Sequence, residues 1–274
     1  NKVTSVGITS GLGSVIYSLT VLARITDNCK YIKIANNFYN KNVKNFIPNM
    51  NNNFDLSSGV SGLASAVFSL FQLTNSIDQL NHSKYLVEFS YEKFLRQISS
   101  DYSTLIGMSH GTSGLINVLS KIEPYYCNGE INNMIQSVLN YENRHFVKSL
   151  NIWPDLRYKN ENSFKCVNQW CHGALGVFYS REHLKNSDQF MKYYNQAVKT
   201  SLNLKLPDTH SVCCGIASHF DFINNTNIIH NEKKLIKDKQ DLINFRLVDQ
   251  FNKNKSFKWS SGIDDCYNLG FFNG

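Results

Sequence analysis

Apolar residues recur along the chain at the spacing of helices. In GLASAVFSLFQL (residues 62–73), Leu63, Val67, Leu70 and Phe71 fall on one face of a helix with 3.6 residues per turn. Alternation of apolar and polar residues, the pattern of a half-buried strand, is rare, and only four prolines occur in 274 residues. The pattern therefore predicts an all-α protein.

A glycine-rich unit precedes an apolar helix several times. The copies read SGVSGLASAVFSL (58–70), HGTSGLINVL (110–119), HGALGVF (172–178) and CGIASHF (214–220), with a looser SGLGSVIYSL at 10–19. The spacing between copies leaves room for a helix, a return helix and a loop. We therefore expect helical hairpins, stacked as an open solenoid or closed as an α/α toroid. In a toroid the glycine turns ring one end of the central cavity, and reactive side chains beside them would share a site.

Reactive residues do stand just before these turns: Asp55, His110, Cys171 and the pair Cys213–Cys214. Each has an ordinary structural explanation when taken alone. Aspartate is a favoured N-cap before a helix, and a histidine at a helix end is often a satisfied structural residue. The glycines themselves are explained by tight turns that let helices pack closely. Repetition near the same point of the repeat favours a shared site.

Three thiols suggest what that site binds. If the repeats close into a ring, Cys171, Cys213 and Cys214 converge. Three sulfur ligands with an open fourth position describe a Zn²⁺ site of the catalytic type. A Cys–Cys–His site that uses His210 or His219 fits the spacing as well.

The remaining composition narrows the class of protein. The other cysteines (Cys29, Cys127, Cys166 and Cys266) are expected to be buried filler, and seven irregularly spaced cysteines favour a reducing compartment over a disulfide framework. The net charge is +7 with scattered lysines, which does not indicate a nucleic-acid site. No apolar run is long enough to cross a bilayer.

The motifs resemble the lanthionine synthetase C-like family. The matching pieces are the repeated GxxG turns, SHGTSG at 109–114, WCHGALG at 170–176 and CCG at 213–215, in the family's order from about residue 10 to 274. Many members have Cys-His-Gly in the last block. The variant here is similar to the cyclase domains of class II lanthipeptide synthetases.

The resemblance implies roles for individual residues. Cys171, Cys213 and Cys214 would be zinc ligands, His110 and Asp55 the acid–base residues, and His172 a substrate contact. Val167 stands where stand-alone cyclases of the family have an arginine. The implied fold is an α/α toroid of about seven hairpins, so residues 1–274 would be one cyclase domain, incomplete at both ends. Gly274 of LGFFNG (269–274) resembles the start of another turn.

The implied activity is lanthipeptide cyclisation. Cysteine thiols of a dehydrated precursor peptide, leader plus core, would add to dehydroalanine or dehydrobutyrine in the same peptide. The resemblance also implies a cytoplasmic location, a fused dehydratase domain in the full-length protein, and membrane association only through a transporter complex. Three alternatives remain: a related protein that adds a glutathione-like thiol, a non-catalytic peptide-binding toroid with structural zinc, and a zinc-dependent α/α-barrel transferase of the prenyltransferase kind.

Overall fold

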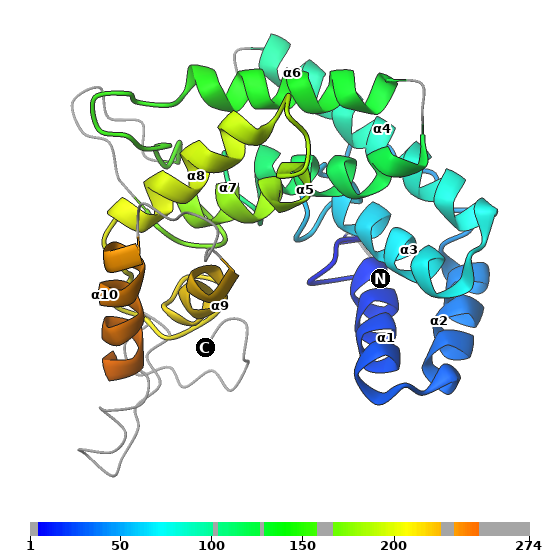
Figure 1. Ribbon diagram of the computed structural model, residues 1–274. Helices are drawn as coiled ribbons and strands as arrows, with labels where there is room; N and C mark the ends of the chain where they lie inside the picture. The colour runs from blue at the N-terminus through cyan, green and yellow to red at the C-terminus, as the bar shows by residue number, and fades with distance from the viewer. Residues whose placement is uncertain (1–4, 101–103, 127–128, 158–166, 226–232, 247–274) are drawn as a thin grey trace. The chain divides into compact units, whose positions relative to one another are not determined.

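Helices that follow one another in the chain pack as hairpins (Figure 1). The computed structural model describes residues 5–100, 104–126, 129–157, 167–225 and 233–246. The pairs in these ranges are α1 (Leu12–Thr26) with α2 (Cys29–Asn42), α3 (Val60–Thr74) with α4 (Ile77–Ser99), α5 (Thr112–Ile122) with α6 (Glu130–Arg144), α7 (Ala174–Arg181) with α8 (Met191–Asn203), and α9 (Ala217–Asn225) with α10 (Lys233–Asn244). Short 3₁₀ helices, Glu123–Tyr125 and Glu182–Leu184, follow α5 and α7. The predicted all-α class, built from helical hairpins, is confirmed for the described residues.

The chain divides into two compact units. Asn1–Arg144 contains the first three hairpins and His145–Gly274 the last two. The expectation that residues 1–274 form one cyclase domain stays a prediction, and the expected turn at Gly274 lies outside the described residues.

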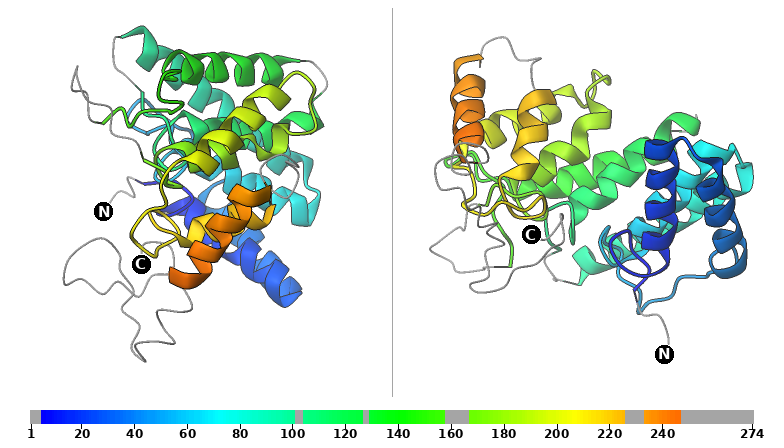
Figure 2. Two further views of the ribbon diagram at one scale, coloured as in Figure 1. Left: turned by 60° about the vertical axis from the view of Figure 1, so that its left-hand side comes forward. Right: turned by 90° about the horizontal axis from the view of Figure 1, so that it is seen from below.

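Helix α3 is the centre of the first unit. It packs against α1, α2, α4 and α5, and every residue from Val60 to Phe71 is buried. Helix α4 instead buries one face, which includes Leu80, Leu86 and Phe94, as expected for an amphipathic helix on the surface of a core. Figure 2 shows α1 and α2 as neighbouring helices of the same unit.

The glycine turns share one backbone pattern. The N–H after the first glycine of each turn donates to a carbonyl seven residues back: Val60 to Asn53 (2.8 Å), Thr112 to Leu105 (3.0 Å), Ala174 to Val167 (3.3 Å) and Ile216 to Thr209 (2.8 Å). A Cβ atom on Gly111 would lie 2.4 Å from the Leu105 carbonyl oxygen, and one on Gly173 would lie 1.9 Å from that of Val167. Only glycine permits this approach without displacement of the backbone. The glycines therefore have a structural role, as expected.

Successive turns within a unit are joined by an equivalent hydrogen bond. Its donor and acceptor are the residues that stand two positions before the first glycine of each turn. The bonds run from Thr9 N to Ser57 O (3.1 Å), from Ser57 N to Ser109 O (2.9 Å) and from Cys171 N to Cys213 O (3.1 Å). Cys171 and Cys213 therefore occupy the same repeat position in neighbouring turns.

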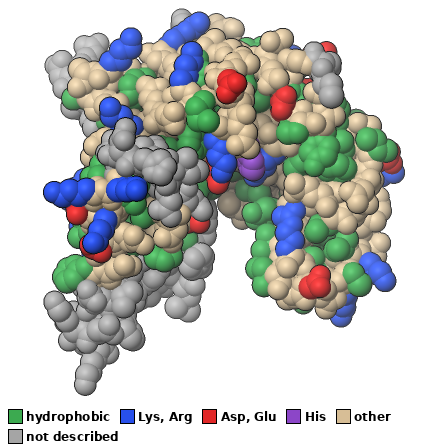
Figure 3. Space-filling model, viewed as in Figure 1, with side chains coloured by type: hydrophobic (Ala, Val, Ile, Leu, Met, Phe, Trp, Pro, Cys, Tyr) green, Lys and Arg blue, Asp and Glu red, His purple; other side chains and the backbone are tan. Residues whose placement is uncertain are grey.

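The surface bears on three expectations from composition. Lysine and arginine side chains are spread over several helices of the face in Figure 3. Within the described residues, no helix is both long and apolar enough to span a membrane. Cys29 is exposed at the start of α2, so its interpretation as buried filler is wrong. Helix α2 buries few residues, among them Ala35 and Tyr39. Cys127, Cys166 and Cys266 lie outside the described residues.

Candidate functional site

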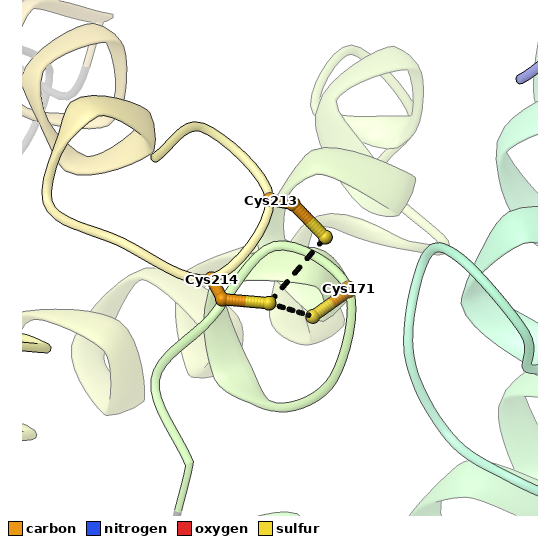
Figure 4. Close-up of side chains that lie close together, drawn as sticks. All are labelled: Cys171, Cys213 and Cys214. Atoms are coloured by element: carbon orange, nitrogen blue, oxygen red, sulfur yellow. Dashed lines mark hydrogen bonds between the residues drawn. The ribbon is translucent and has the colours of Figure 1, made fainter. Parts of the chain in front are cut away.

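Three thiols from two glycine turns gather in the second unit (Figure 4). Cys171 lies in the turn before α7, and Cys213 and Cys214 lie in the turn before α9. Their Sγ atoms all lie within 4.8 Å of one another. The Sγ atom of Cys214 is 3.1 Å from that of Cys171 and 3.5 Å from that of Cys213. Cys171 is buried, whereas Cys213 and Cys214 are partly exposed, so the cluster has a protected side and an accessible side.

The repeat explains how residues 42 positions apart meet. Cys171 and Cys213 hold equivalent positions, and the bond from Cys171 N to Cys213 O brings the two turns together. Cys214 is fixed by its own turn, because its N–H donates to Ser211 Oγ at 3.2 Å and its carbonyl accepts from Thr209 Oγ1 at 2.9 Å. The backbone of the two turns thus brings the three thiols together.

Charge in the cluster concentrates on one sulfur. Hydrogen bonds from Cys171 and Cys213 lower the pKa of Cys214 to about 3, against the opposing effect of burial. The pKa of Cys171 is raised, first by its hydrogen bonds to the other two thiols and then by burial. A cation that displaces the remaining protons would relieve this competition, because thiolates are the form of cysteine that binds metals.

The donor set and its spacing fit zinc. In tetrahedral geometry, Zn–S bonds of about 2.3 Å place sulfur atoms about 3.8 Å apart, which lies within the observed span of the three Sγ atoms. Among the described residues, no histidine or carboxylate joins this group. His219 points its Nε2 atom at the Asn168 carbonyl oxygen, 2.7 Å away. Three protein ligands leave a fourth position for water or a substrate thiol.

Two charged residues near the thiols were missed from the sequence. Asp155, whose side chain is 1% exposed, accepts hydrogen bonds from the backbone N–H and guanidinium of Arg157, the shortest at 2.5 Å. Burial disfavours the ionised form of Asp155, but the bonds from Arg157 outweigh it and lower its pKa. The charges of His172 and Arg157 help to lower the pKa of Cys214. The sequence feature that could have indicated these two residues is the acid–arginine pair in WPDLR (153–157). This pair lies outside the repeated glycine unit, so the repeat did not point to it.

His172 and Val167 occupy the turn that carries Cys171. His172 is 4% exposed, and its charge also lowers the pKa of Asp155. The substrate-contact role of His172 stays a prediction. Val167 uses its carbonyl to accept the turn hydrogen bond from Ala174. Val167 stands where the resemblance led us to expect an arginine. Arg157, ten residues earlier in the chain, places a positive charge near the thiols.

Asp55 and His110 form a pair in the first unit. The Asp55 Oδ2 atom lies 3.5 Å from His110 Nδ1, and their side chains are 9% and 46% exposed. Asp55 Oδ1 also accepts from the N–H groups of Ser58 (2.7 Å) and Gly59 (3.1 Å) just before α3. Gly59 is the N-cap of α3 and no side chain caps that helix, so the expectation that Asp55 is the N-cap is wrong. Asp55 instead binds N–H groups of the loop before the helix and contacts His110 with the same carboxylate.

The ionisation of Asp55 is set by opposing effects. Burial disfavours the carboxylate, but hydrogen bonds from His110 and Ser58 outweigh burial and lower the pKa of Asp55. Asp55 is thus an anion that receives hydrogen bonds at neutral pH, and it orients the imidazole of His110 through Nδ1. The Nε2 side of that imidazole is then the side suited to proton exchange with a bound molecule.

A pocket of about 580 Å³ opens beside this pair. Its lining residues come from the loop before α3, the end of α4 and the loop before α5: Asn53, Phe54, Asp55, Gln97, Thr104, Leu105 and His110. The lining combines amide, hydroxyl and apolar groups around one ionised carboxylate. Such a mixture is typical of sites that bind small molecules or peptide segments.

Helix α6 holds the loop that carries His110. The Glu142 Oε1 atom, fully buried, accepts hydrogen bonds from Thr112 Oγ1 (2.8 Å) and Ser113 Oγ (2.7 Å). Its neighbour Tyr141 donates to the Thr104 carbonyl at 2.7 Å. Adjacent residues of α6 thus fix both ends of the loop. No sequence pattern indicates these contacts, because they join residues 29 to 37 positions apart through a return helix that carries no motif.

Known proteins match the chain at two levels. The family model described as lanthionine synthetase C-like protein matches residues 1–274. Thirteen chains of solved structures match as well. One, described as nisin cyclase, is 14% identical, with a TM-score of 0.48 over 93% of this chain and 84% of that chain. No curated protein sequence matches at a significant level.

Proposed function

The chain belongs to the lanthionine synthetase C-like family, and on that premise we propose that it is a zinc-dependent lanthipeptide cyclase. Its reaction is intramolecular addition of a peptide cysteine thiol to dehydroalanine or dehydrobutyrine, which forms a lanthionine or methyllanthionine thioether. The observation that carries the proposal is the convergence of Cys171, Cys213 and Cys214 from two glycine turns, with sulfur atoms at the spacing of zinc ligands.

The three cysteines would hold the zinc ion as thiolates. When bound, zinc supplies the deprotonation and fixation of a substrate thiol near neutral pH, where a free thiol with a pKa of about 8.5 is mostly protonated. The partly exposed side of the cluster, at Cys213 and Cys214, is the side from which a peptide thiol can approach. Buried Cys171 anchors the site from the protein side.

His110 and Asp55 are the proposed acid–base pair. Addition forms a C–S bond at the β-carbon, breaks the S–H bond and requires a proton at the α-carbon. His110, partly exposed beside the pocket, would donate that proton to the α-carbon or accept the proton of the thiol. Asp55 would keep the imidazole oriented through the contact with Nδ1.

The substrate is proposed to be a dehydrated precursor peptide, leader plus core. The proposal includes a cytoplasmic location, a fused dehydratase domain in the full-length protein and membrane contact only through a transporter complex. The pocket beside His110 supports a peptide segment as ligand, because its mixed polar and apolar lining suits backbone amides and short side chains.

The other candidate functions differ in what they require of the thiols. Addition of a glutathione-like thiol would use the same groups, so substrate assays separate it from cyclisation. Structural zinc would require a fourth protein ligand, and His219 Nε2 contacts the Asn168 carbonyl instead. A prenyltransferase-like site would mix Asp, Cys and His ligands, whereas the described cluster contains only cysteines.

Two substitutions test the assignment of roles. Cys171→Ala is expected to abolish stoichiometric zinc binding and cyclisation together, because it removes one of three ligands. His110→Ala is expected to retain zinc and to lower the cyclisation rate by 10²-fold or more. Cyclisation leaves the peptide mass unchanged, so it is measured as loss of alkylatable thiols, alongside metal content. Stoichiometric zinc in Cys171→Ala would refute the ligand assignment, and unaltered cyclisation by His110→Ala would refute the catalytic role.

A further inference from the structure

A buried histidine occupies a position that is aliphatic in the other turns of both units. The residue four positions after the first glycine is Leu63 before α3, Leu115 before α5 and Val177 before α7, all fully buried. In the turn that carries Cys213 and Cys214, the equivalent residue is His219, which is also fully buried. A polar ring at a core position is costly to bury unless it makes specific hydrogen bonds.

The hydrogen bond of His219 reaches the other ligand turn. Its Nε2 atom lies 2.7 Å from the carbonyl oxygen of Asn168, three residues before Cys171. A carbonyl oxygen only accepts, so Nε2 carries the proton and Nδ1 is the unprotonated nitrogen. Nδ1 is buried and has no hydrogen-bond partner among the described residues. Burial lowers the pKa of His219 to about 4, so the ring is a neutral donor near neutral pH.

Asn168 is the base of the turn that presents Cys171. It pairs with Gly173 in an isolated antiparallel bridge, which makes residues 168–173 a short hairpin with Cys171 near its tip. The Asn168 side chain donates to the Ser201 carbonyl of α8 at 3.0 Å. A partner that holds the Asn168 backbone therefore sets the direction of the whole Cys171 turn.

The two ligand turns are thus joined at two points. At the tip, Cys171 N donates to Cys213 O at 3.1 Å. At the base, His219 donates to Asn168 O. One bond would allow the turns to rotate about it, whereas two bonds separated along the turn fix both their distance and their relative rotation. The spacing of Cys171 from Cys213 and Cys214 depends on this pair of links.

We propose that His219 is a positioning residue of the zinc centre: its Nε2–H bond to Asn168 holds the Cys171 turn against the Cys213–Cys214 turn without contact with the metal. The inference rests on the zinc site of the proposed function, but not on cyclisation. Hydrogen bonds that orient metal ligands typically account for 10- to 100-fold in metal affinity.

The first test compares His219→Leu with His219→Gln. Leucine matches the residue of the equivalent turns and removes the donor, while glutamine keeps an N–H donor at similar reach. Zinc affinity is measured on the full chain at pH 7 by competition with a chromophoric chelator, and Co²⁺ substitution reports thiolate coordination by absorption. We expect His219→Leu to bind zinc 10- to 100-fold more weakly, with weakened thiolate–Co²⁺ bands, and His219→Gln to remain within about threefold of the parent.

The control is His82→Leu in the first unit. His82 is half-buried, lies 3.1 Å from the Tyr39 hydroxyl through Nδ1, and belongs to a unit without the thiols. Its substitution is expected to leave zinc affinity unchanged. The inference is overturned if folded His219→Leu binds zinc as tightly as the parent, or if His219→Gln weakens zinc binding as much as His219→Leu.

A measurement on the parent chain keeps the inference testable if His219→Leu does not fold. Nitrogen-15 NMR of the imidazole should show a neutral ring protonated at Nε2 both with and without zinc. A metal-induced shift of Nδ1 or loss of the Nε2 proton would show direct ligation and overturn the inference. Retention of zinc by Cys171→Ala would remove its premise, whereas zinc binding without cyclisation would leave it intact and count against the proposed function alone.

Discussion

Asp55 shows how one side chain can serve two purposes in this repeat. Its Oδ1 atom accepts from the N–H groups that precede α3, and its Oδ2 atom faces His110. The position of Asp55 before a helix predicted an N-cap, but Gly59 holds that position and Asp55 binds the loop that leads to it. The repeat predicted that Asp55 and His110 would lie near each other, because both stand beside glycine turns. Their contact distance could not be predicted, because the two residues are 55 positions apart and meet only when the turns pack together.

The lowered pKa of Asp55 makes stability depend on pH with a definite sign. The ionised carboxylate stabilises the fold above its unfolded-state pKa of about 3.9, and this contribution is lost as pH falls through the lower folded-state pKa. Asp55→Asn keeps a side-chain oxygen that can accept from the N–H groups of Ser58 and Gly59, and it removes the charge. We expect the variant to be less stable than the parent above about pH 5, with the difference vanishing toward pH 2.

Urea denaturation across this pH range measures the effect. Asp78→Asn is the control, because the Asp78 side chain is 69% exposed and surface ion pairs contribute little. A stability difference for Asp55→Asn that is constant with pH would show that the carboxylate charge is unimportant to the fold.

At the scale of helices and turns, the apolar spacing and the glycines were sufficient to place the elements. Helices α3, α5 and α7 begin directly after Gly59, Gly111 and Gly173, because each glycine packs against a carbonyl of its own turn. Return helices were predicted, but the sequence did not indicate where each begins and ends or which residues each contacts. Glu142 and His219 act through side chains that cross between elements, and no local pattern reports such partners.

Gly173 offers a direct test of the turn geometry. Its φ is +106°, and an added Cβ would lie 1.9 Å from the Val167 carbonyl oxygen. Gly129 also has a positive φ, +75°, but a Cβ there would meet no atom within 4 Å. We expect Gly129→Ala to cost about 1 kcal/mol from backbone strain alone, and Gly173→Ala to cost about 3 kcal/mol or more from strain plus the clash.

Chemical denaturation of both variants, with zinc titration, measures these costs. Gly173 follows Cys171 by two residues, so the displaced turn should also bind zinc more weakly. Equal destabilisation by the two alanines would show that the close approach at Gly173 relaxes without cost.

At the scale of the whole molecule, the repeat accounts for how distant residues meet within each unit. The sequence placed reactive groups near the same point of successive turns, and the structure sharpens this correspondence. Cys171 and Cys213 are equivalent, His110 and Cys214 each stand one position before a first glycine, and Asp55 stands four before one. The two residues of the proposed acid–base pair belong to the first unit, and the thiols belong to the second.

Removal of zinc should therefore destabilise only the second unit. A ligand that binds only the folded state stabilises it by about 2.7 kcal/mol at 100 times its dissociation constant, and the proposed ligands all lie in His145–Gly274. We expect chelation to increase amide hydrogen exchange by roughly 100-fold around residues 168–176 and 213–222. Exchange in α3 and α5 should remain unchanged, because the first unit has its own core around α3.

Re-addition of zinc should restore protection, and His110→Ala, which keeps the thiols, should respond as the parent does. An increase of equal size in both units would show that the metal supports the entire chain, and no change in either would argue against a zinc centre at these thiols.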